Sequence, residues 1–248
     1  NKHTMFSLRN NGILTDRLIM KTILTLLVLL ASTPLYATWS DNAHKLLEAV
    51  RDTNVFVISD EVYEHIVIDG RKHESLAQFP ELRERMMLVY SFGKTFHATG
   101  WKLGYTIAPK EYMIEFRKIH QYNAFCCFTP TQVALAEHLK NPQSYLQLKD
   151  LMQKKRDLFV SLMANTGFDL LPADGGYFIT ASYEKISSMG GLDLAMHLTK
   201  TVGVATIPYC TFYSNGEDHK LLRFCFAKKE ESLIEAANRL QKAQINNC

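Results

Sequence analysis

Three short apolar segments, separated by stretches of helical spacing, constrain the fold of this chain more than any other feature. VFVIS (55–59), MMLVYS (86–91) and GYTIAP (104–109) are rich in β-branched and other apolar residues. Such continuous runs are typical of strands that are buried on both faces. Apolar residues recur with helical spacing at 43–52, 110–124, 130–140 and 143–165. Strands that alternate with helices predict an α/β domain built on a mostly parallel sheet with flanking helices.

The pattern changes near residue 166. Short strands are expected at GFDLLP, GGYFITAS, GVATIP and LLRFCF, together with helices at 192–201 and 229–243. A smaller α+β domain with its helices on one side of the sheet fits this half. We therefore expect a larger domain over 40–150 and a smaller one over 151–248, with a soft boundary between 140 and 166. Residues 1–39 match neither pattern.

Composition excludes several classes of protein. The chain has 248 residues, a net charge of +3 and no dense basic run, so nothing favours a nucleic-acid partner. The number of cysteines, 5, is odd, and their spacing favours neither a disulfide framework nor a metal site. Free thiols are typical of a reducing compartment, so a cytoplasmic location is expected and a membrane partner is not.

One segment argues for a different location. The stretch RLIMKTILTLLVLLASTPLYAT (17–38) places Lys21 before an apolar run that is too short to span a bilayer as a helix. If Met20 were the first residue, 20–37 would resemble a secretory signal peptide, and the protein would be exported. A buried strand or helix is the other interpretation.

Polar side chains follow two of the predicted strands. Asp60 and Tyr63 come after VFVIS, while Ser91 and Lys94 come after MMLVY. Ligands of open α/β sheets bind beyond the carboxyl ends of the strands, so these groups are expected at one edge. An amine can form a Schiff base with an aldehyde, and a carboxylate can pair with a pyridine nitrogen. A hydroxyl and a second cation such as Lys102 can hold a phosphate. Together these groups predict chemistry with pyridoxal 5′-phosphate (PLP).

The same segments carry a family resemblance. SFGKTFHATGWKLGY (91–105) closely resembles the lysine signature of class I, fold-type I PLP-dependent aminotransferases, and SDEVYEHI (59–66) resembles their Asp-x-x-Tyr segment. The resemblance continues through APKEYMIEFRKIHQY, FTPTQVALA, GGYF and LRFCFAKKE. It covers residues 40–245. The GWK form, with Lys102 where most of the class has arginine, is similar to the methionine and kynurenine aminotransferase branch.

The resemblance implies a role for each matching residue. Lys94 would hold the cofactor and move a proton between its C4′ and the substrate Cα. Asp60 would pair with the pyridine nitrogen, and Tyr63 would donate to the 3′-oxygen. Ser91 and Lys102 would contact the phosphate, with Lys102 acting as a point charge that lacks the planar fork of arginine. Arg223 would bind the substrate carboxylate.

The resemblance also implies substrates and a partner. We expect transamination between methionine or an aromatic amino acid and a 2-oxo acid, in a homodimer. Two alternatives stay open. One is a PLP-dependent cysteine-conjugate β-lyase, which uses the same lysine chemistry. The other is a catalytically inactive aminotransferase remnant.

The second alternative follows from what the resemblance lacks. Family members carry an upstream glycine loop for phosphate, an aromatic ring stacked on the cofactor and an Asn-Pro-x-x-Pro segment. Here Asn-Pro occurs only at Asn141-Pro142, on the other side of Lys94. We therefore expect an N-terminally incomplete member of the family, preceded by an unrelated segment.

Overall fold

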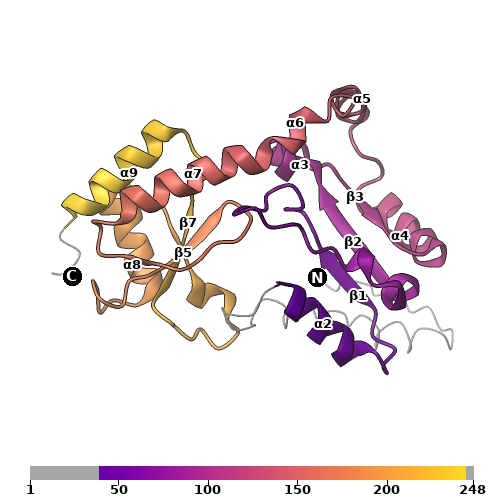
Figure 1. Ribbon diagram of the computed structural model, residues 1–248, viewed down its shortest axis with the longest axis horizontal. Helices are drawn as coiled ribbons and strands as arrows, with labels where there is room; N and C mark the ends of the chain where they lie inside the picture. Colours follow the sequence, from indigo (N-terminus) through magenta and orange to yellow (C-terminus); the bar gives the residue numbers. More distant parts are fainter. Residues whose placement is uncertain (1–38, 244–248) are drawn as a thin grey trace, which may run out of the picture. The chain divides into compact units, whose positions relative to one another are not determined.

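The computed structural model describes residues 39–243, which form two compact units (Figure 1). Among these residues, the first unit comprises 39–62 and Glu74–Ala136, and the second comprises Tyr63–His73 and 137–243. The signal-like segment 17–38 lies outside the described residues. The domain limits predicted from the sequence stay predictions. Within residues 39–243, no helix is long and apolar enough to cross a membrane.

The first unit is built on a three-stranded sheet of order β1-β2-β3. β1 (Val57–Asp60) runs parallel to β2 (Met86–Ser91), with Asp60 opposite Val89. β3 (Gly104–Ile107) is antiparallel to β2, with Ser91 opposite Gly104. The expectation of parallel pairing therefore holds for β1 and β2 but is wrong for β3. The reason is the path of the connection: residues 92–103 fold back on themselves and return the chain beside β2 in the opposite direction, whereas parallel neighbours are joined by a crossover.

One face of this sheet carries the core of the unit. The helix α2 (Trp39–Val50) presents Ala43, Leu47 and Val50 at helical spacing to a buried cluster that includes Val57 and Leu88. Two 3₁₀ turns, η1 (Leu76–Gln78) and η2 (Pro80–Arg85), close the segment before β2 and contribute Leu82, which is fully buried. Both strands that carry predicted site residues contribute side chains to this cluster.

The prediction of strands buried on both faces is wrong for the described part of this unit. β2 alternates between buried and half-buried residues, and β3 is mostly exposed, with Ile107 at 55% exposure. The helix α4 (Lys110–Asn123) buries none of its side chains, and α5 (Thr129–His138) buries only Leu135. The exposed apolar side chains of this region include Ile119, Tyr122, Phe125, Phe128 and Val133. Within residues 39–243, one face of the sheet is therefore buried and the other is only partly covered, for example by the contact between Phe56 and Tyr112 of α4.

The second unit has a four-stranded antiparallel sheet of order β4-β5-β7-β6. Its strands are β4 (Asp169–Leu170), β5 (Phe178–Ser182), β6 (Ile207–Pro208) and β7 (Leu221–Cys225). The helices are α6 (Gln143–Leu146), α7 (Leu148–Met163), α8 (Gly191–His197) and α9 (Glu230–Lys242). A π-helical turn (Leu198–Val202) follows α8, and a 3₁₀ turn, η5 (Tyr209–Phe212), follows β6.

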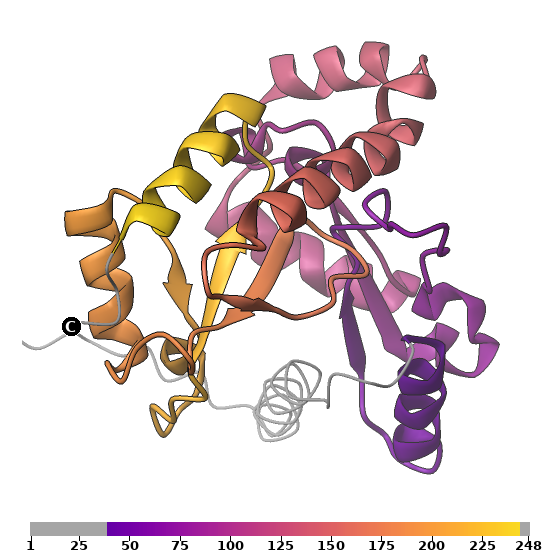
Figure 2. The ribbon, with the colours of Figure 1, turned by 60° about the vertical axis from the view of Figure 1, so that its left-hand side comes forward.

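The core of the second unit lies between its sheet and its helices. α7 and α9 run side by side over the sheet (Figure 2). Met163 from α7 and Leu240 from α9 pack in one buried cluster with Leu222 and Phe224 from β7. Apolar residues at alternate positions of β5 and β7 face this cluster, which agrees with the α+β layer expected from the sequence.

The segment Tyr63–His73 belongs to this second unit although it follows β1 directly. Val67 forms an isolated antiparallel bridge with Gly175, and the Gly176 amide donates to the Ile66 carbonyl at 2.8 Å. The side chain of Ile66 is buried in the core of the second unit. The chain therefore passes from one unit to the other between Asp60 and Tyr63.

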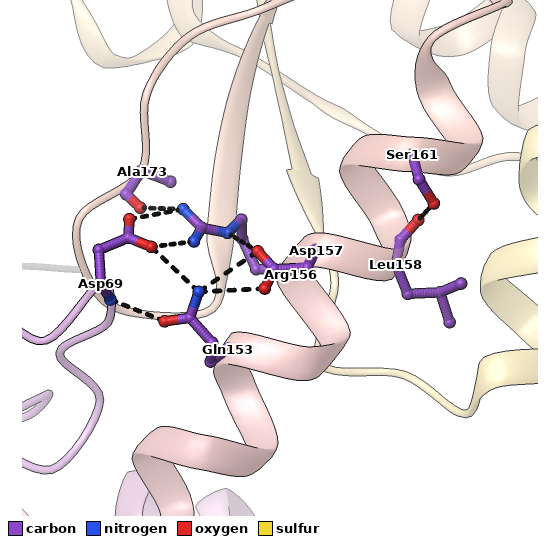
Figure 3. Close-up of polar contacts among 7 residues, drawn as sticks. All are labelled: Asp69, Gln153, Arg156, Asp157, Leu158, Ser161 and Ala173. Carbon is purple, nitrogen blue, oxygen red and sulfur yellow. Dashed lines mark hydrogen bonds and ion pairs between the residues drawn. The ribbon is translucent and has the colours of Figure 1, made fainter.

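A polar cluster fastens the far end of this segment to α7 (Figure 3). Arg156 makes an ion pair with Asp69, and its Nη1 also donates to the Ala173 carbonyl at 3.2 Å. Gln153 accepts from the Asp69 amide at 2.7 Å and donates to the Asp69 carboxylate at 3.0 Å. Hydrogen bonds from Arg156 and then Gln153 lower the pKa of Asp69 from 3.8 to about 2.

This pKa predicts an acid-sensitive contribution to stability. The folded pKa of Asp69 lies below its unfolded value. Its contribution to the free energy of unfolding is therefore present above about pH 4 and is lost as the pH falls through 2. The Asp69 side chain is 43% exposed, so solvent screening reduces this contribution to about 1 kcal/mol. Urea unfolding of wild type and Asp69→Asn between pH 5 and pH 2 should therefore converge toward low pH.

The matched control for this prediction is Asp169→Asn. Asp169 pairs with Lys185 at 2.7 Å in the same unit, but the two side chains are 51% and 74% exposed. Its removal should leave the free energy of unfolding at pH 7 nearly unchanged, because solvent screens so exposed a pair. The role given to Asp69 would be contradicted if both variants lost the same free energy of unfolding at pH 7. It would also be contradicted if the difference in that free energy between Asp69→Asn and wild type did not shrink toward pH 2.

Candidate functional site

The carboxyl ends of β1 and β2 bring two of the predicted residues to one edge of the sheet. Asp60 is the last residue of β1 and lies opposite Val89, while Ser91 ends β2 two residues further on. The Asp60 side chain is exposed, and its Oδ1 accepts from the Val62 amide at 3.3 Å. A carboxylate and a hydroxyl are thus presented at the same edge.

The loop 92–103 joins β2 to β3 and closes on itself. Its ends are held together by the pairing of Ser91 with Gly104, and the Gly93 amide donates to the Leu103 carbonyl at 3.4 Å. Lys94 lies in the single-turn helix α3 (Phe92–Thr95) and is half-buried. Lys102 ends the 3₁₀ turn η3 (Thr99–Trp101) with φ of 53° and is exposed. Both lysines therefore belong to one closed loop beside Ser91.

Two glycines make this closure possible. A Cβ at Gly104 would lie 2.3 Å from the Tyr90 carbonyl oxygen, and one at Gly93 would lie 3.0 Å from the Ala98 carbonyl oxygen. A contact of 2.3 Å is an overlap with a backbone atom, so position 104 requires glycine while the backbone keeps this path. At 3.0 Å the added Cβ would be crowded, and the neighbouring backbone would have to move by a few tenths of an ångström. The small residues around Lys94 thus have a local steric cause.

Directly after Asp60, the carboxylate of Glu61 is 4% exposed and fully engaged. Its Oε2 accepts from the Tyr90 hydroxyl at 2.9 Å, and its Oε1 accepts from the Ser59 hydroxyl at 3.1 Å and the Leu76 amide at 3.0 Å. Nothing in the sequence distinguished this residue, because glutamate is usually exposed. Sequence reasoning therefore missed it.

The other two predicted residues lie in the second unit. Tyr63 is half-buried, its ring packs edge-on against Tyr177 with centroids 5.1 Å apart, and a Cβ at Gly176 would touch its ring at 3.6 Å. The glycine pair before Tyr177 thus gives Tyr63 its place. The structure groups four predicted residues in the first unit and two in the second.

Arg223 lies at the centre of β7, between Thr180 of β5 and Ile207 of β6. Its guanidinium carbon is 4.2 Å from the centroid of the Phe178 ring and 5.2 Å from that of Phe212. These aromatic contacts fix the guanidinium plane. Its Nε is buried and has no hydrogen-bond partner among residues 39–243. A buried donor without a partner is costly unless a ligand accepts its hydrogen bond. Sequence reasoning missed both Phe178 and Phe212.

The strand that carries Arg223 is anchored at its start by Asp218. The Asp218 carboxylate accepts from the Tyr183 hydroxyl at 2.8 Å and from the Gly191 amide at 2.7 Å. Burial raises the pKa of Asp218, but these hydrogen bonds and that from the Lys220 amide outweigh it, so the pKa lies below its usual value. Burial and then Asp218 raise the pKa of Tyr183, which therefore stays a neutral donor.

Comparison with known proteins identifies the family. Residues 40–240 match the model of aminotransferase class I and II. Methionine aminotransferase of Escherichia coli K12 is 44% identical over 198 residues, which cover 79% of this chain and 51% of that protein. Human kynurenine–oxoglutarate transaminase 3 is 35% identical over 206 residues, covering 75% of this chain and 45% of that protein.

Solved structures agree with the sequence comparison. A methionine aminotransferase from E. coli superimposes with a TM-score of 0.78 at 43% identity, covering 83% of this chain and 54% of that one. N-Succinyldiaminopimelate aminotransferase from Mycobacterium tuberculosis superimposes with a TM-score of 0.78 at 31% identity, and the match covers 85% of this chain and 56% of that one. The chain belongs to the class I and II aminotransferases and has the α/β fold of fold-type I. It spans about half the length of these relatives.

The enzymes of this family depend on PLP. The donor set of the first unit fits that cofactor: an amine on Lys94, a carboxylate on Asp60 and a hydroxyl on Ser91 belong to one sheet edge and its loop. Lys102 adds a cation to the same loop. In the second unit, the buried Nε of Arg223 is an orphaned donor suited to an anionic ligand.

Proposed function

We propose that the protein transfers the amino group of methionine or an aromatic amino acid to a 2-oxo acid with the aid of PLP. The observation that carries this proposal is the closed loop 92–103, which keeps Lys94 and Lys102 beside Ser91 and at the same edge as Asp60. A solvated surface lysine needs no such loop. The choice of donor rests on similarity to a methionine aminotransferase and to kynurenine–oxoglutarate transaminases.

When bound, PLP supplies an electron sink for the negative charge that develops at the substrate Cα. In the proposal the Lys94 amine would hold the cofactor and would move a proton between the substrate Cα and C4′. A lysine amine is suited to both steps because it is a nucleophile and a base. Asp60 holds the proton on the pyridine nitrogen, since a carboxylate favours the charged form of its partner.

The remaining residues bind and orient. Tyr63 donates to the 3′-oxygen, and Ser91 and Lys102 contact the phosphate. Lys102 follows an exposed tryptophan at the end of its turn, which leaves its amine accessible to an anion. Arg223 binds the substrate carboxylate with a guanidinium whose position is already restricted by the rings of Phe178 and Phe212.

We further propose a homodimer in the cytoplasm. The exposed apolar side chains of α4 and the following loop, Tyr122 and Phe125 among them, support a partner surface. The irregular set of cysteines supports a reducing compartment.

The test is binding followed by one half-reaction. Purified protein titrated with PLP should acquire the absorbance of a lysine-bound cofactor, and borohydride reduction with peptide mapping should place it on Lys94. Addition of methionine should then convert that absorbance to the pyridoxamine form and release the corresponding 2-oxo acid in a 1:1 ratio to bound cofactor. A second 2-oxo acid should restore the first spectrum.

Two results would replace this proposal by an alternative. Pyruvate and ammonia released from a cysteine conjugate, without formation of the pyridoxamine form, would identify a β-lyase. Folded protein, shown by circular dichroism, that binds no PLP at millimolar concentration would identify a remnant without the activity.

A further inference from the structure

We infer that Glu61 is a positioning residue that holds Asp60 at the place where it meets the cofactor ring. The inference rests on the proposed function, because the pyridine nitrogen that Asp60 would meet is there only if PLP binds. Glu61 itself would touch neither cofactor nor substrate. It acts through the backbone and through the residues on either side of Asp60.

The first argument is the completeness of its contacts. Three donors reach the two carboxylate oxygens: the Tyr90 hydroxyl from β2, the Ser59 hydroxyl from β1 and the Leu76 amide from η1. They come from three separate segments of the first unit. A single carboxylate thus links the strand that ends at Asp60, the strand that ends at Ser91 and the turn between them.

The second argument is energetic. Moving a carboxylate to a site that is 4% exposed is unfavourable, and hydrogen bonds offset that cost only when its acceptor positions are filled. An apolar side chain of similar volume would stabilise a core at least as well. A buried carboxylate is therefore a poor choice for stability alone, but a good one for fixing geometry, because its acceptor directions are defined.

The third argument is the position of Asp60 between two fixed points. On one side, the Ser59 hydroxyl is bonded to Glu61. On the other, the Glu61 amide donates to the Val89 carbonyl at 2.8 Å, which continues the β1–β2 ladder by one residue. The exposed Asp60 side chain therefore projects from a backbone that is held on both sides. A carboxylate on a fixed backbone loses less entropy when it pairs with a cation.

A double-mutant cycle tests this inference. Glu61→Gln keeps the shape of the side chain but removes its charge and places an amide donor where an acceptor was. In an otherwise wild-type chain, we expect an apparent Kd for PLP about tenfold higher, the effect of one weakened charge-assisted hydrogen bond. In an Asp60→Asn background, the same substitution should change the Kd by less than about twofold, because the interaction through which Glu61 acts is already lost.

The controls separate positioning from stability. Leu82→Ala removes a fully buried side chain from the same core cluster and should lower the melting temperature while leaving the Kd for PLP within about twofold. Tyr90→Phe, which deletes a single donor to Glu61, is the second variant if Glu61→Gln does not fold. Tyr90→Phe should also raise the Kd for PLP, by a smaller factor than Glu61→Gln. In the Asp60→Asn background it should leave the Kd unchanged.

Four outcomes decide between these possibilities. Equal losses in both backgrounds, or no loss in either, would overturn the positioning role. Wild-type protein that is folded but binds no PLP would instead overturn the proposed function on which the inference rests. A loss confined to the background that contains Asp60 would establish Glu61 as the residue that positions it.

Discussion

Replacement of Lys94 by alanine is expected to abolish covalent attachment of PLP and to lower the rate of amino transfer by about a thousandfold or more. The size follows from the two roles proposed for this amine. General acid–base catalysis alone contributes about 10²–10⁴-fold, and loss of the covalent link adds to it. Lys94 is half-buried in a one-turn helix whose Thr95 hydroxyl donates to the Ser91 carbonyl at 3.3 Å, and a truncated side chain leaves that bond intact.

The measurement is single-turnover conversion of bound PLP by methionine, with borohydride trapping as a second readout. Lys94→Arg is the informative companion, because it keeps a cation in the loop but supplies neither a nucleophile nor a base near neutral pH. It should be as inactive as the alanine variant. Lys118→Ala removes an exposed lysine paired with Glu115 on α4 and should leave the rate unchanged. Trapped cofactor on any other lysine would refute the assignment.

Replacement of Gly104 by alanine is expected to destabilise the first unit by about 3 kcal/mol, at the upper end of what overpacking costs. The added Cβ would lie 2.3 Å from the Tyr90 carbonyl oxygen, which is a backbone atom and cannot turn aside. The β2–β3 ladder must then open at the pair Ser91–Gly104, where the loop 92–103 is closed. Binding of PLP should weaken together with stability.

Gly100→Ala is the matched control. It lies in the same loop, and an added Cβ would find nothing within 4 Å. Its effect on the free energy of unfolding should be within about 0.5 kcal/mol. Urea unfolding of both variants, with PLP titration of the folded proteins, measures both consequences. Equal stability of the two variants would show that the strand pair has more freedom than its close approach implies.

Much of the fold follows from local pattern. The alternation of apolar runs with helical spacing located α2, α4, α5 and α9 to within a few residues, because the spacing that buries one helix face is set by the chain itself. The predicted stretch 143–165 contains two helices, α6 and α7, and their separation was not predicted. The pairing of the strands was harder to predict from the sequence. The antiparallel addition of β3 depends on the closure of loop 92–103, and closure depends on contacts across the loop such as that between Gly93 and Leu103.

For the candidate site, the residue types after two predicted strands indicated PLP, because an amine, a carboxylate and a second cation can hold that cofactor. The roles predicted for Asp60, Tyr63, Ser91, Lys94, Lys102 and Arg223 came from the family resemblance of their motifs and stay predictions. Only the tertiary structure decided which other residues hold these groups. Glu61 is buried by strands and turns distant in sequence, and Phe178 and Phe212 meet Arg223 through strand register and a turn. Residue type and spacing carry the chemistry of single side chains, whereas burial, strain and orientation arise from contacts between segments that the sequence order does not bring together.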